Sequence, residues 1–504
     1  MPLPSWNKLV QRPSSLFFVL ILALSYFTYF HNYWNPSDVF WDENYHIASA
    51  QKYLNGVFFM EQHPPLGKLL IAAGEKIVNA NPVDNEFIGT DYAKGFEDAF
   101  SFAGYRFFPA LLAWLTAPLF FFIFLVLTKR PEWATFLTFP YIFDNALVVH
   151  LRGAMLEGPL LFFVVATILL FLLILRSKHK RQQLLTASLW FGIALALVAT
   201  TKLLGLVLIL LIPAILYALY PNRKAIGSFL LLAGCGFLLT YVAVWHIHFA
   251  LGRTVNPALP DAGLYQASPA YKEIIANGQM RSLGAFPIML IDSLKFVRHY
   301  NRGTPRLDMC KPDENGSPFF FWPLGARSIN YRWASVSALT YRYLYLQANP
   351  VVWWSGLLAV IVTIGLLVSS ALAPVRWSFK NPFLLLTFTG LYVSYMIAIS
   401  RIDRVLYLYH YFIPLLFTFI LTALIFLEID RIGNFILNEQ RKTVLLLCFG
   451  ALIFLGFETY RPLTYYEPIT KMQLERRAFF PLWELSCVNC QKKSLLVVPD
   501  KVSP

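Results

Sequence analysis

Two adjacent carboxylates, Asp42 and Glu43, come shortly after the first long apolar run of the chain. An ionised side chain inside a bilayer costs about 2.5–3.5 kcal/mol on insertion scales, so acids at a membrane edge lie in water or in a working cavity. Trp41, Tyr45 and His63 are close to them in the sequence. Acids, an imidazole and flat rings together suit a polar ligand better than lipid.

A carboxylate in this position can act as a general base that takes the proton of an attacking hydroxyl group. Neighbouring acids raise each other's pKa, which brings a base closer to neutral pH. We predict that Asp42 is this base and that Glu43 orients the acceptor or shares the proton. The alternative is that Asp42 only caps the helix that follows, because Asp is a favoured N-cap residue.

The composition excludes a soluble protein. Of 504 residues, 57% are hydrophobic and only 14% are charged, and the mean hydropathy is +0.54, which is far from the balance of soluble domains. The net charge of +14 does not indicate nucleic-acid binding, because the Lys and Arg residues fall in short clusters between apolar runs. Such clusters set the orientation of membrane proteins. We predict an all-α polytopic membrane protein.

Membrane-crossing segments need about 20 apolar residues each. The first run could pass for a signal peptide, but no small-residue cleavage site follows it, so we interpret it as an uncleaved span. With ten further runs, the sequence predicts about eleven transmembrane helices. They fall near 16–29, 105–127, 132–149, 157–175, 184–200, 203–220, 226–248, 351–373, 382–400, 405–427 and 443–460.

The orientation follows from the short connections. Under this count their basic residues, such as Lys129 and Arg130, all fall on one side, and the positive-inside rule makes that side cytoplasmic. The N-terminus is then inside, and the working face is external. The predicted organisation is a membrane domain over 1–460, with two large external loops at 34–104 and 249–350, and an external tail over 461–504.

Several motifs occur in an order that resembles one family. They are WDE with ASAQKYLNGVFFMEQHPPLGKLLIA, GYRFFPALL, DNALVVHLRGAMLEGPLLFF, SPFFFWPL with NPVVWW, and RVLYLYHYFIPLLF. From about residue 38 to 416 the chain looks like the protein O-mannosyltransferases, glycosyltransferases of the GT-C fold. The resemblance implies eleven spans, and transfer of mannose from a polyprenyl-phosphate carrier to Ser or Thr hydroxyls of exported proteins. It also implies the base role for Asp42.

Two departures from the family pattern matter. Eukaryotic members carry a β-trefoil MIR domain in the second large loop, and this loop is too short for one. We therefore expect a bacterial member in the inner (plasma) membrane, with a periplasmic active site. Glu157 stands where the family usually has an Asp, and we expect no catalytic role for it because the side chain is one methylene longer.

The carrier phosphate that departs needs cationic or hydrogen-bonding partners, and the planar fork of Arg suits it. Arg106 in GYRFFPALL matches an arginine of the family, and Arg152 is a second candidate. Arg404, His410 and His63 complete the predicted phosphate-binding set. The alternatives are that an arginine near a span end reaches the lipid head groups, and that His63 caps a helix.

Aromatic residues are the candidates for a wall that holds the acceptor or the lipid. They are Trp41 and Tyr45 in the first loop and Phe321 and Trp322 in the second. The alternative for the FFFW run is a belt at the membrane interface, where Trp is enriched.

No metal site is predicted. His246 and His248 have no acid at ligand spacing, so we expect no required cofactor, although a divalent cation is compatible with the chemistry. The predicted partners are the lipid-linked sugar donor, a secreted or membrane protein acceptor, the bilayer and, in a dimer, a second copy. The alternative function uses the same fold to deliver a carrier-linked sugar to a lipid (lipid A-like) or glycan acceptor, since fold does not settle function. A transporter would show paired repeats and broken helices at mid-membrane, which we do not find in the sequence.

Overall fold

The protein divides into two compact units in the computed structural model. The described residues are 12–88, 92–255, 266–311, 314–372 and 379–488. Unit 1 comprises Met1–Ser15, Leu22–Ile123 and Leu151–Thr304, and unit 2 comprises Leu16–Ile21, Phe124–His150 and Pro305–Pro504.

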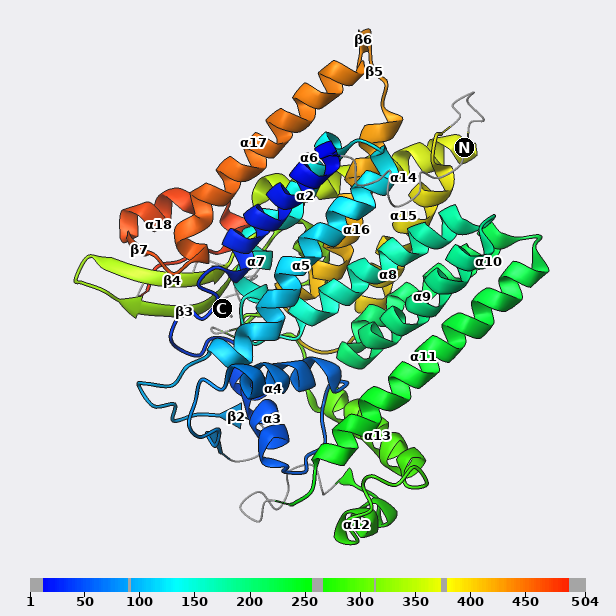
Figure 1. Ribbon diagram of the computed structural model, residues 1–504. Helices are drawn as coiled ribbons and strands as arrows, with labels where there is room; N and C mark the ends of the chain where they lie inside the picture. Colours follow the sequence, from blue (N-terminus) through cyan, green and yellow to red (C-terminus); the bar gives the residue numbers. More distant parts are fainter. Residues whose placement is uncertain (1–11, 89–91, 256–265, 312–313, 373–378, 489–504) are drawn as a thin grey trace, which may run out of the picture. The chain divides into compact units, whose positions relative to one another are not determined.

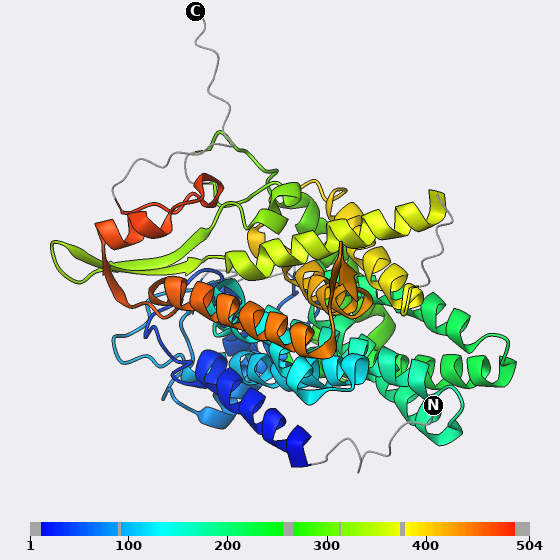
Figure 2. The same ribbon diagram turned by 90° about the horizontal axis from the view of Figure 1, so that it is seen from above.

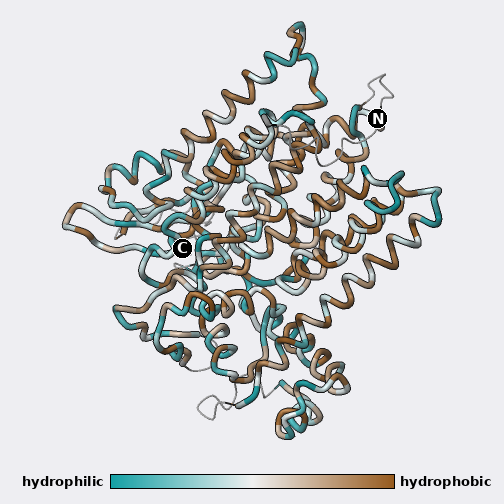
Figure 3. The backbone as a smooth tube through the Cα atoms, in the orientation of Figure 1, coloured by the Kyte–Doolittle hydropathy of each residue, from teal (hydrophilic) through white to brown (hydrophobic). Residues whose placement is uncertain are grey.

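Long apolar helices dominate both units, with polar residues gathered at their ends (Figure 3). Eight helices among the described residues are long and apolar enough to cross a bilayer, or nine if a pair bent by 64°, α6 (Pro131–Ile142) and α7 (Asn145–Leu151), is one span. Two shorter apolar helices cover Ser14–Phe30 and Leu203–Leu219. All eleven predicted apolar runs are therefore helical, whereas the number that crosses the membrane stays a prediction. The eight long helices are α5 (Ala103–Thr128), α8 (Glu157–Ser177), α9 (Arg181–Thr201), α11 (Arg223–Leu251), α14 (Pro350–Leu372), α15 (Pro382–Ile399), α16 (Phe412–Glu428, with the turn from Leu408) and α17 (Glu439–Thr464).

In unit 1, α9 packs between α8 and α11 (Figure 1). Two glycines allow the closest approach of α9 to α11. A Cβ on Gly192 would lie 2.0 Å from the carbonyl oxygen of Ala233, and one on Gly236 would lie 2.6 Å from that of Leu189. Small residues at such crossings let two membrane helices come into backbone contact.

The first large loop folds onto the end of unit 1. It contains α3 (Glu43–Asn55), α4 (Leu66–Val78) and a short hairpin of β1 (Phe87–Ile88) and β2 (Tyr92–Ala93). Helix α3 ends at Gly56, whose φ of +66° is the left-handed conformation that glycine favours at this position. Helix α4 begins directly after the Pro64–Pro65 pair.

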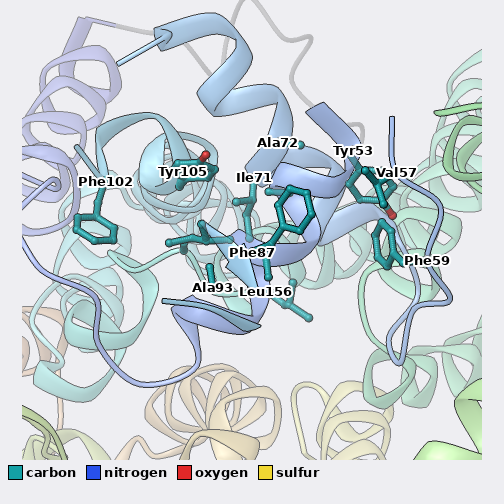
Figure 4. Packing of buried hydrophobic residues seen from close by; sticks show 14 of the residues in the cluster. Tyr53, Val57, Phe59, Ile71, Ala72, Phe87, Ala93, Phe102, Tyr105 and Leu156 are labelled. Atoms are coloured by element: carbon teal, nitrogen blue, oxygen red, sulfur yellow. The ribbon is translucent and has the colours of Figure 1, made fainter. Parts of the chain in front are cut away.

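A buried apolar cluster fixes α3 and α4 in place. The cluster contains Ile47 of α3, Ile71 of α4, Phe102 and Tyr105 at the start of α5, and Leu156 just before α8. Figure 4 labels all of these except Ile47. The cluster therefore joins the first loop to two membrane helices. The first loop is part of the core of unit 1, not a free connection.

The middle of the first large loop lies beside the start of the second. Val57 and Thr254 form a parallel bridge, with the Phe58 N–H donating to the Thr254 carbonyl at 2.7 Å and the Arg253 N–H donating to the Gly56 carbonyl at 2.7 Å. The second loop continues with α12 (Pro269–Ala276) and α13 (Phe286–Gly303). The middle of the first loop and the start of the second therefore lie together in unit 1.

Unit 2 contains an antiparallel sheet that the all-α prediction does not include. Its order is β3 (Ile329–Ser335), β4 (Thr340–Leu346) and β7 (Pro468–Thr470). Strand β7 belongs to the predicted tail and pairs with β4 of the second loop. Helix α18 (Lys471–Arg477) follows β7 beside the β3–β4 hairpin (Figure 2), and Trp483 beyond it is fully buried. The described part of the tail is thus folded against loop two.

Candidate active site

A buried ion pair lies directly beside the predicted base. Arg106, in the first turn of α5, and Glu43, the first residue of α3, are both fully buried. Arg106 Nε donates to Glu43 Oε1 at 2.6 Å and Nη2 donates to Oε2 at 2.7 Å. This two-point geometry is the strongest form of an Arg–carboxylate contact.

Arg106 uses its remaining donors on the backbone that precedes Asp42. Nη1 donates to the carbonyls of Trp34 and Pro36 at 2.7 and 2.5 Å, and Nη2 donates to that of Asp38 at 2.7 Å. With the two bonds to Glu43, all five N–H groups of the guanidinium have protein acceptors. These contacts do not support the predicted phosphate contact of Arg106. They hold the backbone carbonyls of Trp34, Pro36 and Asp38 against the start of α5.

The carboxylate of Glu43 is also fully engaged in hydrogen bonds. Besides Arg106, its carboxylate accepts the Ala154 N–H at 2.8 Å and the Phe40 N–H at 3.0 Å. The neighbouring Gly153 leaves room for these contacts, because a Cβ would lie 2.8 Å from Phe40 Cζ and 3.3 Å from Glu43 Oε1. A fully buried carboxylate with these partners is not placed to share a proton with Asp42 or to orient an acceptor. The geometry therefore argues against that predicted role of Glu43.

Asp42 lies at the turn that this pair supports. Trp41 has a φ of +51°, a rare conformation for a non-glycine residue, and Asp42 occupies the N-cap position of α3. Its side chain makes no capping hydrogen bond, so the capping alternative is not seen in its usual form. Asp42 is partly exposed, as is Trp41, and Tyr45 is exposed one turn along α3.

Arg152, between α7 and α8, binds the backbone a few residues before the carbonyls that Arg106 binds. Nη1 donates to the Thr28 carbonyl at 3.3 Å, and Nη2 donates to those of His31 and Asn32 at 3.1 and 2.5 Å. The segment 28–38 is therefore held through its carbonyls by two buried arginines from different elements. These contacts favour positioning over a direct phosphate contact for Arg152 as well.

The predicted residues Phe321 and Trp322 of the second loop, and Arg404 and His410 further along the chain, lie in unit 2. Trp322 is fully buried, its Nε1 donates to Ser317 Oγ at 2.7 Å, and its ring stacks on His410 with centroids 6.2 Å apart. The Tyr407 N–H donates to His410 Nδ1 at 3.2 Å. Phe321 and Arg404 are partly exposed. The structure thus brings Trp322 and His410 together, and the burial of Trp322 fits a core residue better than a ligand wall.

Two family models match the chain. Residues 19–251 match the model described as dolichyl-phosphate-mannose-protein mannosyltransferase, and residues 294–483 match the C-terminal four-transmembrane region of protein O-mannosyltransferase.

The chain belongs to the protein O-mannosyltransferase family.

Individual relatives are more distant. A dolichyl-phosphate-mannose–protein mannosyltransferase 1 of Candida albicans is 32% identical over 192 residues, covering 37% of this chain and 21% of the relative. A protein O-mannosyltransferase 1 of Drosophila melanogaster is 27% identical over 302 residues, covering 57% and 33%. The chain thus spans no more than about a third of the length of these curated relatives.

The fold has a solved counterpart. The Saccharomyces cerevisiae protein O-mannosyltransferase Pmt1–Pmt2 complex, bound to the sugar donor, matches with a TM-score of 0.77 at 17% identity, covering 96% of this chain and 94% of the solved one. The predicted GT-C class of helical membrane protein is confirmed.

Sequence reasoning missed two buried ion pairs near the family motifs. Lys68 of α4 donates to Glu61 Oε1 at 2.6 Å and to Ser49 Oγ at 3.0 Å. Lys202, after α9, pairs with Glu157 at the start of α8. The available signal was the presence of lysines in otherwise apolar stretches, since such cations are buried only with a partner. Glu157 is thus engaged by Lys202, and the absence of a catalytic role for it stays a prediction.

The His63 prediction has a partial structural context. His63 is partly exposed, and its backbone N–H donates to Glu61 Oε1 at 3.1 Å, next to Lys68. Of the two histidines considered for zinc, His248 shares a 2.7 Å hydrogen bond with the Tyr53 hydroxyl. Among the described residues, no group of three or more His, Cys, Asp and Glu side chains is arranged to hold a metal ion.

Glu75 of α4 is a carboxyl group of the first loop whose pKa is strongly shifted. Its Oε1 accepts the N–H groups of Ala80 and Asn81 at 3.0 and 3.2 Å, and Asn81 Nδ2 at 3.1 Å. Burial, with a smaller effect of Asp84, raises the pKa of Glu75 to about 7. The turn that ends α4 therefore depends on a carboxyl group that changes its charge near neutral pH.

Proposed function

We propose that the protein transfers mannose from a polyprenyl-phosphate carrier to Ser or Thr hydroxyls of exported proteins. The observation that carries this proposal is the Arg106–Glu43 pair, which fixes the turn that presents a partly exposed Asp42. The family descriptions and the names of the relatives supply the donor and acceptor class.

In this reaction Asp42 is the general base. Its carboxylate takes the proton of the acceptor hydroxyl while that oxygen forms a bond to the anomeric carbon of mannose. The bond between that carbon and the phosphate oxygen breaks, and the carrier leaves as polyprenyl phosphate. Glu43 and Arg106 keep the base in position, and preorganisation of this kind removes part of the entropic barrier.

The leaving phosphate needs hydrogen-bond donors, and His63 remains the proposed donor within unit 1. It lies beside the buried Lys68–Glu61 pair, whose geometry fixes the chain just before the two prolines. The predicted phosphate roles of Arg404 and His410, and the wall formed by Phe321, stay predictions. A dimer is also a proposal, suggested by the solved yeast complex of two related chains.

We place the site on the external face of a bacterial inner membrane, which for a Gram-negative cell is the periplasmic face. In unit 1, the basic connection between α8 and α9, with Lys178 and Arg181, lies at the helix ends away from Lys202 and Leu251. The first loop is bridged to the start of the second loop at the latter end. The positive-inside rule then makes the loop end external.

The test is transfer of radiolabelled mannose from polyprenyl-phosphate-mannose to a Ser/Thr-rich peptide by membranes that contain the protein. Asp42→Asn should lower transfer by about 100-fold or more, the range expected for a lost general base. Asp98→Asn is the matched control, because Asp98 is an exposed acid of the same loop.

Three results would change the proposal. Label that enters a lipid or glycan fraction and not the peptide would support the alternative acceptor. Undiminished transfer by Asp42→Asn would place the base elsewhere. Equal losses in both variants would indicate a general effect of loop charge.

A further inference from the structure

Helix α13 of the second loop exposes a face that no described element covers. Its buried side chains, Phe286, Met289, Phe296 and Val297, recur at helical spacing. The opposite face carries Ile288 and Ile291, which are 38% and 53% exposed. Exposed apolar side chains gathered on one face indicate an interaction surface.

The exposed stripe changes from apolar to basic along the helix. Residues 288, 291, 295, 298 and 302 follow one another at intervals of three and four, so they lie on one face. The residues at these positions are Ile288, Ile291, Lys295, Arg298 and Arg302, and all five are exposed. Two apolar positions are thus followed by three cationic ones.

The one acidic residue of α13 is turned away from this stripe. Asp292 is buried and accepts the Ser268 N–H at 2.8 Å, at the N-terminus of α12. Lys295 approaches Asp292 at only 3.4 Å and is 72% exposed. Lys295 is thus weakly paired, whereas Arg298 and Arg302 have no acidic partner within α13.

The position of α13 connects this stripe to the membrane. Its buried face packs on Trp245 and Phe249, in the last two turns of α11. Helix α11 is a candidate span with only 22% of its apolar window buried, and Ile247 near its end is 49% exposed. Helix α13 thus lies beside the end of a helix that faces lipid (Figure 1, Figure 3).

We infer that α13 lies in the membrane interface and binds anionic lipid. Ile288 and Ile291 enter the boundary of the acyl chains, and Lys295, Arg298 and Arg302 bind lipid phosphate groups. An apolar patch with adjacent cations is the composition of interfacial helices, and each cation adds attraction to an anionic leaflet. The surface is separate from Asp42 and does not depend on the transfer reaction.

The experiment places a fluorescent label on the stripe of the full chain. In a background with the free cysteines Cys235, Cys310 and Cys448 replaced by Ser, Ile291→Cys is labelled with an environment-sensitive dye. Lys272→Cys, at an exposed position of α12, is the matched control. Both proteins are reconstituted in vesicles of phosphatidylcholine with or without phosphatidylglycerol.

The 291 label should emit at shorter wavelength and be quenched at least fivefold more by spin-labelled lipids than the 272 label. Phosphatidylglycerol should increase that quenching about twofold. This increase should be lost in a variant with Lys295→Gln, Arg298→Gln and Arg302→Gln. A circular dichroism melt checks that each variant is folded.

Three outcomes would overturn the inference in whole or in part. Equal access of aqueous iodide to both labels would show that the stripe faces water. Shielding of residue 291 without lipid quenching, with cross-linking between two copies at this position, would assign the face to a protein contact. If the quenching is the same with and without phosphatidylglycerol, the helix does not bind anionic lipid preferentially.

Discussion

At the scale of single residues, burial separates two acids that look equivalent in the sequence. Asp42 is partly exposed, whereas Glu43 is fully buried and accepts hydrogen bonds from Arg106, Ala154 and Phe40. The sequence can place both acids at a membrane edge, and it does. It cannot show which one is buried, because the partner of Glu43 lies 63 positions away.

Glu43→Gln should therefore act on stability. It leaves the buried Arg106 without its counter-charge, and breaking a buried ion pair costs about 3–5 kcal/mol. We expect a clear loss of thermal stability in detergent, measured by tryptophan fluorescence. Asp42→Asn should lose transfer with little change of Tm. A Glu43→Gln protein with an unchanged Tm would contradict the positioning role.

Glu75 should give the protein a pH-dependent stability. Its pKa is about 7 in the folded chain and near 4.5 when exposed, so the folded state favours the protonated form. This contribution is fully present below about pH 4.5 and is lost as the pH rises through 7. Between pH 5 and 8, Tm should fall more steeply in the wild type than in Glu75→Gln. Parallel curves would exclude the effect.

At the scale of elements, helices follow from apolar runs, but the contacts that position them do not. Each predicted run is helical, because composition alone favours a helix in a membrane. The sheet of β3, β4 and β7 was missed, although Tyr341, Tyr343 and Tyr345 alternate as strand residues do. Its third strand is over a hundred residues further on, and pairing at that distance leaves no local signal.

Gly153→Ala tests the contact between the α7–α8 connection and the active-site turn. A Cβ at this position would lie 2.8 Å from Phe40, and overpacking of this kind costs about 1–3 kcal/mol. We expect a lower Tm and about tenfold weaker transfer. Gly227→Ala in α11 is the control, because no atom lies within 4 Å of its added Cβ. If the two variants have the same Tm and the same transfer activity, the turn accommodates the added Cβ without cost.

At the scale of the whole molecule, the family motifs predicted the GT-C fold and its order of helices. The bend between α6 and α7 was not predicted. The polar residue there, Asp144, accepts the Leu147 N–H at 2.9 Å and Trp353 Nε1 at 2.8 Å. A hydropathy pattern shows how long an apolar run is, but not the direction of the helix axis. It therefore predicts a span over this run and does not predict the bend between α6 and α7.

The orientation of the membrane domain can be measured by labelling. In the background without free cysteines, Asp98→Cys should react with a membrane-impermeant maleimide in spheroplasts. Lys178→Cys, in the basic connection, should react only in inverted vesicles. Both positions are exposed, so access depends on the side of the membrane. The opposite pattern would reverse the predicted topology.

The hydrogen bonds from Arg106 and Arg152 to segment 28–38 limit which sequence changes this segment tolerates during evolution. Both arginines bind main-chain carbonyl oxygens, which every amino acid possesses. The identity of exposed side chains such as Trp34 and Asn32 is therefore weakly constrained by these bonds, whereas the number of residues is strongly constrained. Deletion of one residue would shift carbonyls out of reach. Related chains should differ in the amino acids of this segment but keep its number of residues.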